Sequence, residues 1–187
     1  DNKNVFPQNT ATVRPTELPC DIHHATIQGE KWMILVGLLD GKPYEVMGGL
    51  SNLIEIPQKH TEGLLIKHPR KTMNSVYDLM VGANGDEIRV RDIVKVFDNP
   101  NNSAFTRLIS LSLRHGANIQ YAVEQMQKDR DSDMFSFAKC VARVLKSYIK
   151  DGTEATDKEC PSCGVGDGLI YIEGCLTCKN CGYAKCG

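Results

Sequence analysis

The first half of the chain contains short runs that are rich in hydrophobic and β-branched residues, as β-strands are. These β-rich runs are residues 22–28, 31–39, 44–47, 63–67, 73–81 and 87–90, and residues 31–39 are almost continuously apolar. Short turn sequences rich in glycine, asparagine and aspartate separate several of them, and such turns join neighbouring antiparallel strands. Gly48 and Gly49 follow the third run and are expected to end it. The pattern therefore predicts a small, mostly antiparallel sheet.

After residue 100 the period lengthens to that of an α-helix. About three helices are expected, with N-caps at Ser103, Asn118 and Asp133 and with Gly116 and Gly152 as stop signals. Their apolar faces are Phe105, Leu108, Ile109 and Ser112; Ile119, Ala122, Val123 and Met126; and Phe137, Val141, Val144, Leu145 and Tyr148. Strands followed by helices are typical of an α+β fold in which the helices pack on one face of the sheet.

Composition divides the chain into four segments. Residues 1–19 are polar, contain three prolines and are expected to form an extended arm. Residues 20–151 hold the strands and helices and are predicted to form one α+β domain. Residues 152–159 are polar and charged without an apolar period, and we interpret them as a linker. Residues 160–187 are expected to be a separate, cysteine-rich tail.

Length and charge exclude some classes of function. With 187 residues the chain is long enough for one core of ordinary size and a small appendage. Its formal charge of −1 gives no overall field that would attract nucleic acid or an anionic membrane. No apolar run approaches the roughly 18 residues of a membrane helix. Because the first residue is Asp1 rather than methionine, we expect a fragment, a processed product or one part of a split protein.

The placement of the cysteines is the most informative feature of the composition. Six of the eight lie within residues 160–187, and only Cys20 and Cys140 belong to the rest of the chain. A secreted disulfide scaffold would distribute its cysteines through the core that it staples. Cys-x-x-Cys units crowded into one end indicate a metal site, a thiol redox site or both, and a reducing, cytoplasmic compartment. Cys140 falls within a predicted helix, and we interpret it as a small core residue.

Two Cys-x-x-Cys-Gly sequences, at residues 160–164 and 178–182, have the form of zinc knuckles. Each presents two thiolates from one tight turn, and the glycine lets the turn close with a positive φ. Residues 169–173 between them are expected to form the strand of a zinc ribbon. So small a tail has no sizeable core, whereas zinc binding supplies roughly 10–16 kcal/mol in comparable peptides. The predicted zinc ligands are Cys160, Cys163, Cys178 and Cys181.

This assignment leaves Cys175 and Cys186 as candidates for disulfide exchange. A second division gives zinc Cys160, Cys163, Cys175 and Cys178, and leaves Cys181 and Cys186 as a dithiol on a flexible end. Disulfides or a metal-free redox cluster are a further interpretation. The glycines that follow Cys163 and Cys181 favour the first division. In both divisions Cys186 is a free thiol close to the C-terminus, where the backbone is expected to be mobile.

The sequence of the tail and of several segments before it resembles that of a known protein family. The tail reads CPSCG and then EGCLTCKNCGYAKC, at residues 160–164 and 173–186. The further segments are residues 14–20, 41–46, 105–116, 123–126 and 135–146. Together they resemble the C-terminal part of adenosylcobalamin-dependent (class II) ribonucleotide reductases, and the resemblance covers the chain from about residue 14 to the end.

The resemblance implies an α+β accessory domain and a redox tail of a ribonucleoside-diphosphate reductase, which converts ribonucleotides to deoxyribonucleotides. In that family, tail cysteines re-reduce an active-site disulfide of the catalytic domain and accept electrons from a thioredoxin-like donor. By matching position, Cys175 and Cys186 would perform this exchange. The family's catalytic barrel, which uses adenosylcobalamin, has no counterpart in this sequence. The chain alone is therefore expected to be inactive and to need a catalytic domain or subunit as its partner.

Other classes of function stay open. Many zinc ribbons bind nucleic acid or protein, and the tail could be such a module or a purely structural unit with inert thiols. Its two lysines, Lys179 and Lys185, are balanced by Asp167 and Glu173, which argues against contacts with phosphates of nucleic acid.

Basic residues elsewhere have simpler interpretations. The basic run at residues 67–71 is interpreted as a solvated hairpin turn, with docking against an acidic reductase core as the alternative. Arg107 and Arg114 lie seven residues apart on one helix face. We expect that face to be solvated, with contact to a catalytic domain as the alternative.

Overall fold

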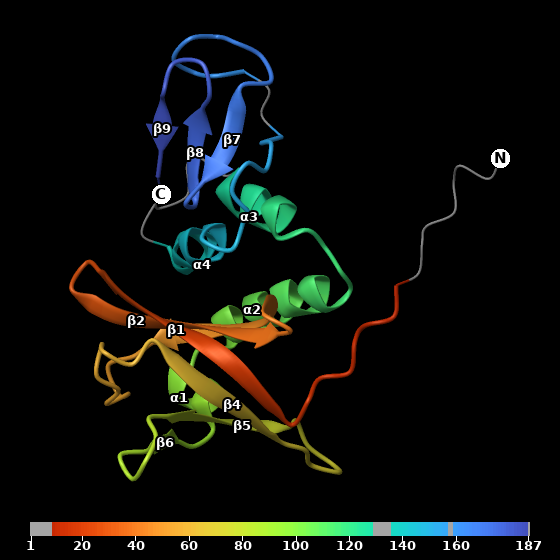
Figure 1. The fold of residues 1–187 in the computed structure, drawn as a ribbon. Helices are drawn as coiled ribbons and strands as arrows, with labels where there is room; N and C mark the ends of the chain where they lie inside the picture. Colours follow the sequence, from red (N-terminus) through yellow and green to blue (C-terminus); the bar gives the residue numbers. More distant parts are fainter. Residues whose placement is uncertain (1–8, 129–135, 157–158, 187) are drawn as a thin grey trace, which may run out of the picture. The chain divides into compact units, whose positions relative to one another are not determined.

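The computed structural model describes residues 9–128, 136–156 and 159–186. The chain divides into two compact units, Asp1–Ala117 (unit 1) and Asn118–Gly187 (unit 2). Each unit has its own sheet, drawn from red to green in unit 1 and in blue in unit 2 (Figure 1). The predicted α+β class is confirmed, because a six-stranded antiparallel sheet, helices and a C-terminal cluster of cysteines are all present.

Unit 1 is built around one antiparallel sheet. Its strands are β1 (Glu17–Ile27), β2 (Glu30–Leu39), β3 (Lys42–Leu50), β4 (Glu62–His68), β5 (Val76–Val81) and β6 (Ile88–Val90). Their order across the sheet is β3-β2-β1-β4-β5-β6, and every neighbouring pair is antiparallel. Two-residue turns join β1 to β2 and β2 to β3, as the turn sequences predict.

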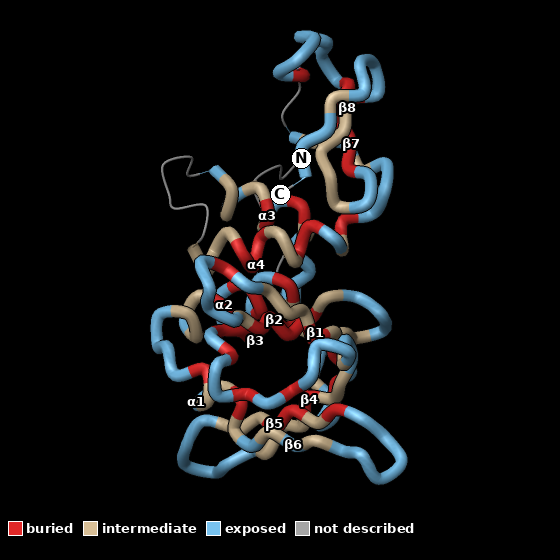
Figure 2. Tube along the Cα trace, turned by 90° about the vertical axis from the view of Figure 1, so that its left-hand side faces the viewer, coloured by how far each residue is buried: buried red, intermediate tan, exposed pale blue. Residues whose placement is uncertain are grey.

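The short helix α1 (Ile93–Phe97) contacts both β3 and β5, which are far apart in the strand order. The sheet must therefore curve strongly, and Figure 1 shows it bent around α1. The core inside the curve consists of buried side chains from β1, β2, β4, β5 and α1, together with Ile54 and Ile56. Figure 2 shows buried segments, drawn in red, along the strands of this sheet.

Helix α2 (Pro100–Arg114) lies along β3, an edge strand of the sheet. The Ser110 hydroxyl accepts a hydrogen bond from the Val46 N–H (2.9 Å) and donates one to the Thr106 carbonyl (2.7 Å). Thr106 and Ser110 are therefore buried together with Ile109 and Leu113. The predicted apolar face was wrong in part, since the helix binds the free backbone of an edge strand and needs polar residues to do so.

The ends of α2 differ in how well the sequence predicts them. The helix begins at Pro100 with Asn99 as its N-cap, about one turn before the predicted cap at Ser103. Proline at the first helical position explains the early start, because its missing N–H is not needed there. The predicted stop is confirmed: Gly116 has a φ of 80° directly after the cap residue His115.

Two strands extend beyond their predicted ends. β1 includes Pro19, which the composition assigns to the arm. The proline is tolerated because this part of β1 pairs only with β4, and pairing with β2 starts at Cys20. β3 continues through Gly48 and Gly49, which the sequence pattern expects to end it. Glycine is needed at these positions because neighbouring residues leave no room for a side chain. A Cβ on Gly49 would lie 2.8 Å from the Cβ of Phe97.

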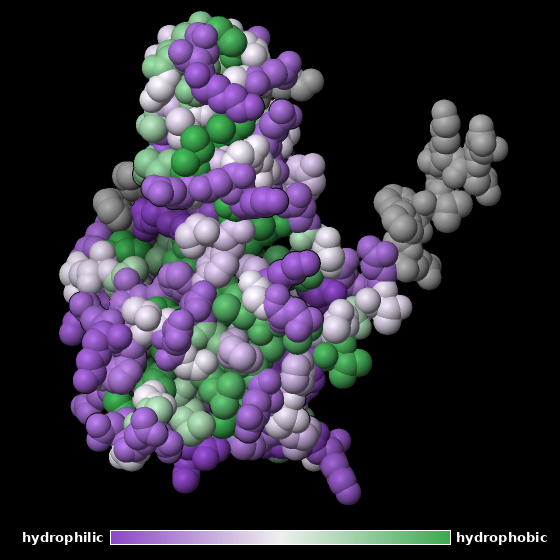
Figure 3. Space-filling view, in the orientation of Figure 1, coloured by the Kyte–Doolittle hydropathy of each residue, from purple (hydrophilic) through white to green (hydrophobic). Residues whose placement is uncertain are grey.

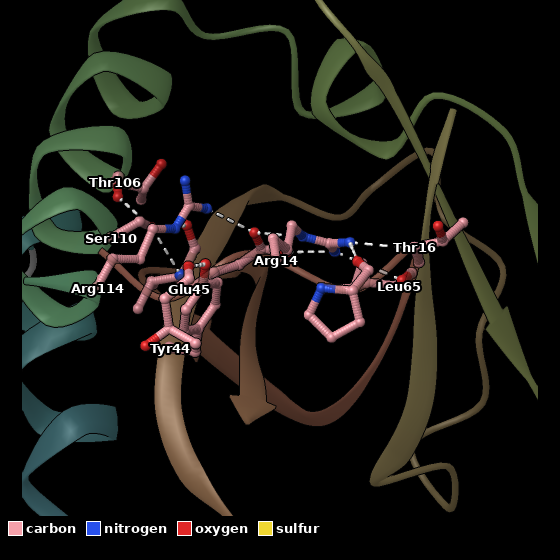
Figure 4. A network of polar contacts seen from close by, with 11 residues as sticks. Arg14, Thr16, Tyr44, Glu45, Leu65, Thr106, Ser110 and Arg114 are labelled. Carbon is pink, nitrogen blue, oxygen red and sulfur yellow. Dashed lines mark hydrogen bonds and ion pairs between the residues drawn. The ribbon is translucent and has the colours of Figure 1, made fainter. Parts of the chain in front are cut away.

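An ion-pair network fixes the segment before β1 onto unit 1 (Figure 4). Glu45 of β3 is 1% exposed and binds Arg14 at 2.7 and 2.9 Å and Arg114 of α2 at 2.7 Å. Each guanidinium also lies 5.1 Å from the centre of an aromatic ring, Arg14 over Tyr77 and Arg114 over Tyr44. Arg114 therefore belongs to a buried ion pair, and its expected place on a solvated face was wrong.

Unit 2 combines two helices with a small sheet. The helices are α3 (Ile119–Gln127) and α4 (Phe137–Lys146), and the antiparallel strands are β7 (Leu169–Ile172), β8 (Cys175–Cys178) and β9 (Ala184–Lys185). Asn118 caps α3 as predicted, accepting a hydrogen bond from the Gln120 N–H. The predicted cap at Asp133 lies outside the described residues, and Ser136 caps α4.

The described part of the predicted linker is tied to both the sheet and α3. The Ala155 N–H donates to the Leu169 carbonyl of β7 at 3.0 Å, and Thr156 donates two hydrogen bonds to Glu124 of α3. Helices α3 and α4 therefore belong to the same compact unit as the cysteine-bearing sheet. The division between units falls after residue 117, not within residues 152–159.

In the part of the chain that the structure describes, no helix is long and apolar enough to cross a membrane. Figure 3 shows hydrophilic side chains spread over the face in view, with apolar side chains gathered in small patches between them. Scattered apolar residues on a surface are ordinary and do not by themselves indicate a binding site.

Candidate metal centre and exchangeable disulfide

The two Cys-x-x-Cys-Gly sequences fold into the same local structure. Gly164 and Gly182 have φ values of 68° and 73°, which residues with a side chain rarely adopt. Each glycine N–H donates to the carbonyl of the first cysteine in its turn, at 2.8 and 3.1 Å. The N–H two residues after that cysteine donates to its sulfur at 3.4 Å in both turns. The two knuckles therefore present their sulfurs in the same way.

The knuckles bring four sulfur atoms together, those of Cys160, Cys163, Cys178 and Cys181. All four lie within 4.8 Å of one another, with Cys160 and Cys181 3.7 Å apart and Cys163 and Cys178 3.8 Å apart. A tetrahedral zinc ion with Zn–S bonds of about 2.3 Å would hold its sulfurs about 3.8 Å apart. The cluster could therefore hold a metal ion, and its ligand type and spacing fit zinc.

Hydrogen bonds favour the thiolate form, which a metal needs, at two of the four cysteines. The Val165 N–H and the Asn180 side-chain amide lower the pKa of Cys163 to about 6. The N–H groups of Cys181 and Asn180 likewise lower the pKa of Cys178. The backbone of Tyr183 lowers the pKa of Cys181, but desolvation and hydrogen bonds with the neighbouring sulfurs outweigh it and raise that pKa to about 11. Because only the deprotonated sulfur binds a metal, the protein contacts favour the metal-binding form at Cys163 and Cys178, and a cation is needed to favour it at Cys181.

Cys175 and Cys186 form a disulfide between β8 and β9. Leu176 pairs with Lys185 in these strands, so the two cysteines stand opposite each other at the end of the ladder. Their Cα atoms are 4.3 Å apart, close to the spacing of directly opposed residues that share no backbone hydrogen bonds. The expectation of a free Cys186 thiol on a flexible end was wrong, because β9 holds this segment against β8.

The metal cluster and the disulfide are separate sites on one strand. Cys175 and Cys178 are the two ends of β8, about 10 Å apart at roughly 3.3 Å per residue. An offset of three residues also places their side chains on opposite faces. The sulfurs of the alternative ligand set, in which Cys175 takes the place of Cys181, are not brought together, since Cys175 is bonded to Cys186.

Lys146 is buried near the hairpin turn that precedes Cys175, and nothing in the sequence predicts its burial. A Cβ on Gly174 would lie 3.4 Å from the carbonyl of Lys146, so the turn packs against the end of α4. Lys146 is 5% exposed, and burial lowers its pKa, as does the nearby charge of Lys185. Lysine in the last turn of an amphipathic helix is normally solvated, so only the packing of the β7–β8 turn shows that Lys146 is buried.

The thiols differ in the chemistry open to them. A cluster of four cysteine ligands leaves no position for a substrate and suits a structural metal. The disulfide joins half-buried Cys175 to exposed Cys186, so an external thiol can reach it. Cys20 and Cys140 are each 2% exposed, and burial raises the pKa of both thiols, to about 12 for Cys20. Cys140 is thus the core residue that its helical position predicts.

Comparison with protein-family models matches residues 18–150 to the NrdJ homologue C-terminal domain. The matched segment runs from β1 through α4 and ends before the cysteine-bearing strands. No curated protein and no solved structure matches the chain. The family match therefore applies to the α+β part, and the metal cluster and disulfide are known from their own geometry.

Proposed function

The chain belongs to the family of NrdJ homologue C-terminal domains, and we propose that it is the electron-delivering C-terminal module of a ribonucleotide reductase. The family name links it to these oxidoreductases, which convert ribonucleotides to deoxyribonucleotides. In our proposal the reductase acts on ribonucleoside diphosphates. The module would act on the active-site disulfide of a catalytic domain or subunit, not on the nucleotide.

The observation that carries this proposal is the Cys175–Cys186 disulfide, which is separate from the four-cysteine cluster. Two cysteines that pair with each other can store two electrons as a dithiol and release them as a disulfide. Cys186 is exposed and follows a strand of only two residues. Little backbone pairing would have to open to present its sulfur to a partner.

The exchange would take place in two steps from the reduced tail. The Cys186 thiolate attacks the disulfide of the catalytic domain, forms a mixed disulfide and releases one partner thiolate. Cys175 then attacks the Cys186 sulfur, which releases the second partner thiolate and forms the Cys175–Cys186 bond. The partner thiolates take up the two protons of the tail thiols. A thioredoxin-like donor would reduce the tail again by the same two steps.

Zinc bound by Cys160, Cys163, Cys178 and Cys181 would stabilise the sheet that carries this pair. Strand β8 joins the two sites, since Cys178 at one end is a proposed ligand and Cys175 at the other is a proposed exchange thiol. The metal would thus hold Cys175 opposite Cys186. Adenosylcobalamin would belong to the catalytic domain, and we assign it no residue of this chain. A reducing cytoplasm suits such chemistry.

The proposal can be tested by combining the chain with the catalytic domain of its reductase. The variants to compare with the wild type are Cys186→Ser and, as a control, Cys140→Ala. Cys186 lies outside the metal cluster, so its substitution should leave zinc content and folding unchanged. Cys140 is a buried thiol of α4 that takes part in neither site.

A pre-reduced catalytic domain should complete one turnover with every variant, because the first turnover needs no re-reduction. With a thioredoxin-like donor, Cys186→Ser should then stall while Cys140→Ala continues. Dithiothreitol should restore part of the rate by entering the active site directly. Repeated turnover of Cys186→Ser at the wild-type rate with the protein donor would show that the tail does not carry the electrons.

A further inference from the structure

A cavity of about 440 Å³ opens in unit 1 beside β4, β5 and β6. It is lined by His68, Arg70, Val76, Asp78, Arg89, Arg91 and Asp92. With the histidine neutral, three arginines against two aspartates give the lining a net charge of +1. Its volume lies within the range of small-molecule sites, about 300–1,000 Å³. Part of the basic run at residues 67–71 therefore forms a cavity wall.

The cavity is organised by a carboxylate on the outer face of the sheet. Leu79 and Val81 of β5 belong to the core, so Asp78 points to the opposite side, yet it is only 5% exposed. It accepts hydrogen bonds from Arg89 at 2.8 and 3.0 Å and from the Asp92 N–H at 3.0 Å. Its Oδ2 also lies 3.1 Å from the Nε2 of His68. Burial by itself would raise the pKa of Asp78, but these contacts lower it.

The ionised Asp78 holds Arg89 in one orientation. The Nε and one Nη of Arg89 donate to Asp78, which leaves the other Nη for a ligand as far as the described residues show. Arg70 and Arg91 are exposed at the same cavity. A fixed guanidinium with two further guanidiniums beside it suits a phosphate group, which arginine binds through paired N–H donors.

We propose that this cavity binds a small molecule that carries a phosphate group. Arg70, Arg89 and Arg91 would bind the phosphate, and Val76 would contact the less polar part of the ligand. An extended acidic peptide suits the cavity less well, because three guanidiniums at one cavity match a single compact anion, whereas a run of carboxylates would extend past them. The site lies wholly in unit 1 and is independent of the cysteine tail.

Isothermal titration calorimetry of the full chain tests this site with four probes: pyrophosphate, adenosine 5′-diphosphate, adenosine and, as an acidic peptide, hexaglutamate. Saturable binding of one or both phosphates is expected, with a dissociation constant below about 1 mM, and none of adenosine. Binding of pyrophosphate as tight as that of the nucleotide would show that the phosphates alone are recognised. Tighter binding of the nucleotide would identify an organic phosphate as the ligand.

The variants Arg70→Gln and Arg91→Gln should each weaken binding about tenfold, the usual effect of losing one charge-assisted hydrogen bond. Both residues are exposed, so circular dichroism should show an unchanged fold. Arg107→Gln removes another exposed arginine of unit 1, outside the cavity lining, and should bind as the wild type does. Three results would each overturn the proposal: no binding of either phosphate, equal affinity in all three variants, or binding of hexaglutamate alone.

Discussion

Arg14 and Glu45 form a two-point ion pair that joins the segment before the first strand to β3. The Nε and one Nη of Arg14 lie 2.9 and 2.7 Å from the two carboxylate oxygens, and the side chains are only 5% and 1% exposed. Glu45 is also bound by Arg114 at 2.7 Å, from 69 residues further along the chain. Three distant parts of unit 1 therefore meet at one buried carboxylate (Figure 4).

Replacing Arg14 with alanine should destabilise unit 1 by about 3–5 kcal/mol, because it leaves Glu45 buried with one of its two cationic partners missing. Urea unfolding followed by circular dichroism measures the change. Arg107→Ala, which removes an exposed arginine of α2, should cost less than about 0.5 kcal/mol. Equal and small effects of the two substitutions would show that the ion pair contributes little to stability.

A side chain at position 49 should strain the packing of α1 against β3. The Cβ of Gly49→Ala would lie 2.8 Å from the Cβ of Phe97, closer than real Cβ contacts, and a tight 3.1 Å from its Cγ. We expect a loss of about 1–3 kcal/mol, measured by thermal unfolding. Gly168→Ala is the control, since its nearest contact would be an ordinary 3.6 Å. A Gly49→Ala variant as stable as the wild type would mean that α1 moves freely away from β3.

The first strands of unit 1 and two helix boundaries could be predicted because their signals are local: β-rich runs along β1 and β2, turn sequences, the Asn118 cap and the Gly116 stop. Helix α1 could not, since its sequence Ile-Val-Lys-Val-Phe is rich in β-branched residues that favour strands. Ile93 and Phe97 become helical because the curved sheet buries both. The buried face of α2 depends likewise on an edge strand about 60 residues away.

We expect the chain to contain one zinc ion when it is purified under reducing conditions, because four cysteine sulfurs lie at a spacing that fits tetrahedral zinc. Elemental analysis should give about one zinc per chain for the wild type and for Cys140→Ala. Cys178→Ser removes a buried ligand and should lose the metal and the order of the β7–β9 sheet. A metal-free wild type whose tail is still folded would contradict this prediction.

The part of the candidate site whose residues lie close together in the sequence was predictable. Cys-x-x-Cys-Gly builds each knuckle within five residues, so the cysteine spacing together with the following glycine favours Cys160, Cys163, Cys178 and Cys181 as the ligand set. The pairing of Cys175 with Cys186 depends on β9, whose residues Ala184 and Lys185 carry no strand signal. Buried polar residues such as Lys146 and Asp78 are also hidden in the sequence, because only contacts with other elements take them out of water.

Replacing Lys146 with methionine should stabilise unit 2 at neutral pH, since burial disfavours the charged ammonium in the fold. The folded pKa is lowered from 10.5, so above it the unfolded state binds more protons and stability rises with pH towards 10.5. The advantage of Lys146→Met over the wild type should therefore shrink between pH 7 and pH 10.5. Urea unfolding of both proteins at several pH values measures this difference, and a constant difference would show that Lys146 is not the titrating group.

The eight cysteines should react with an alkylating reagent in three separate stages at pH 8. Cys20, with a pKa of about 12, is only about one part in ten thousand thiolate at that pH, and Cys140 is also buried with a raised pKa.

The zinc-loaded, oxidised chain should therefore react slowly at every described cysteine. Reduction by a thioredoxin-like donor should expose two thiols, Cys175 and Cys186, because they alone form the disulfide. A chelator should then release the four metal ligands, and only denaturant should expose Cys20 and Cys140. Peptide mapping by mass spectrometry after each stage gives the order. Alkylation of Cys160 or Cys178 at the first reduction step would show that the metal cluster and the exchange pair are not separate sites.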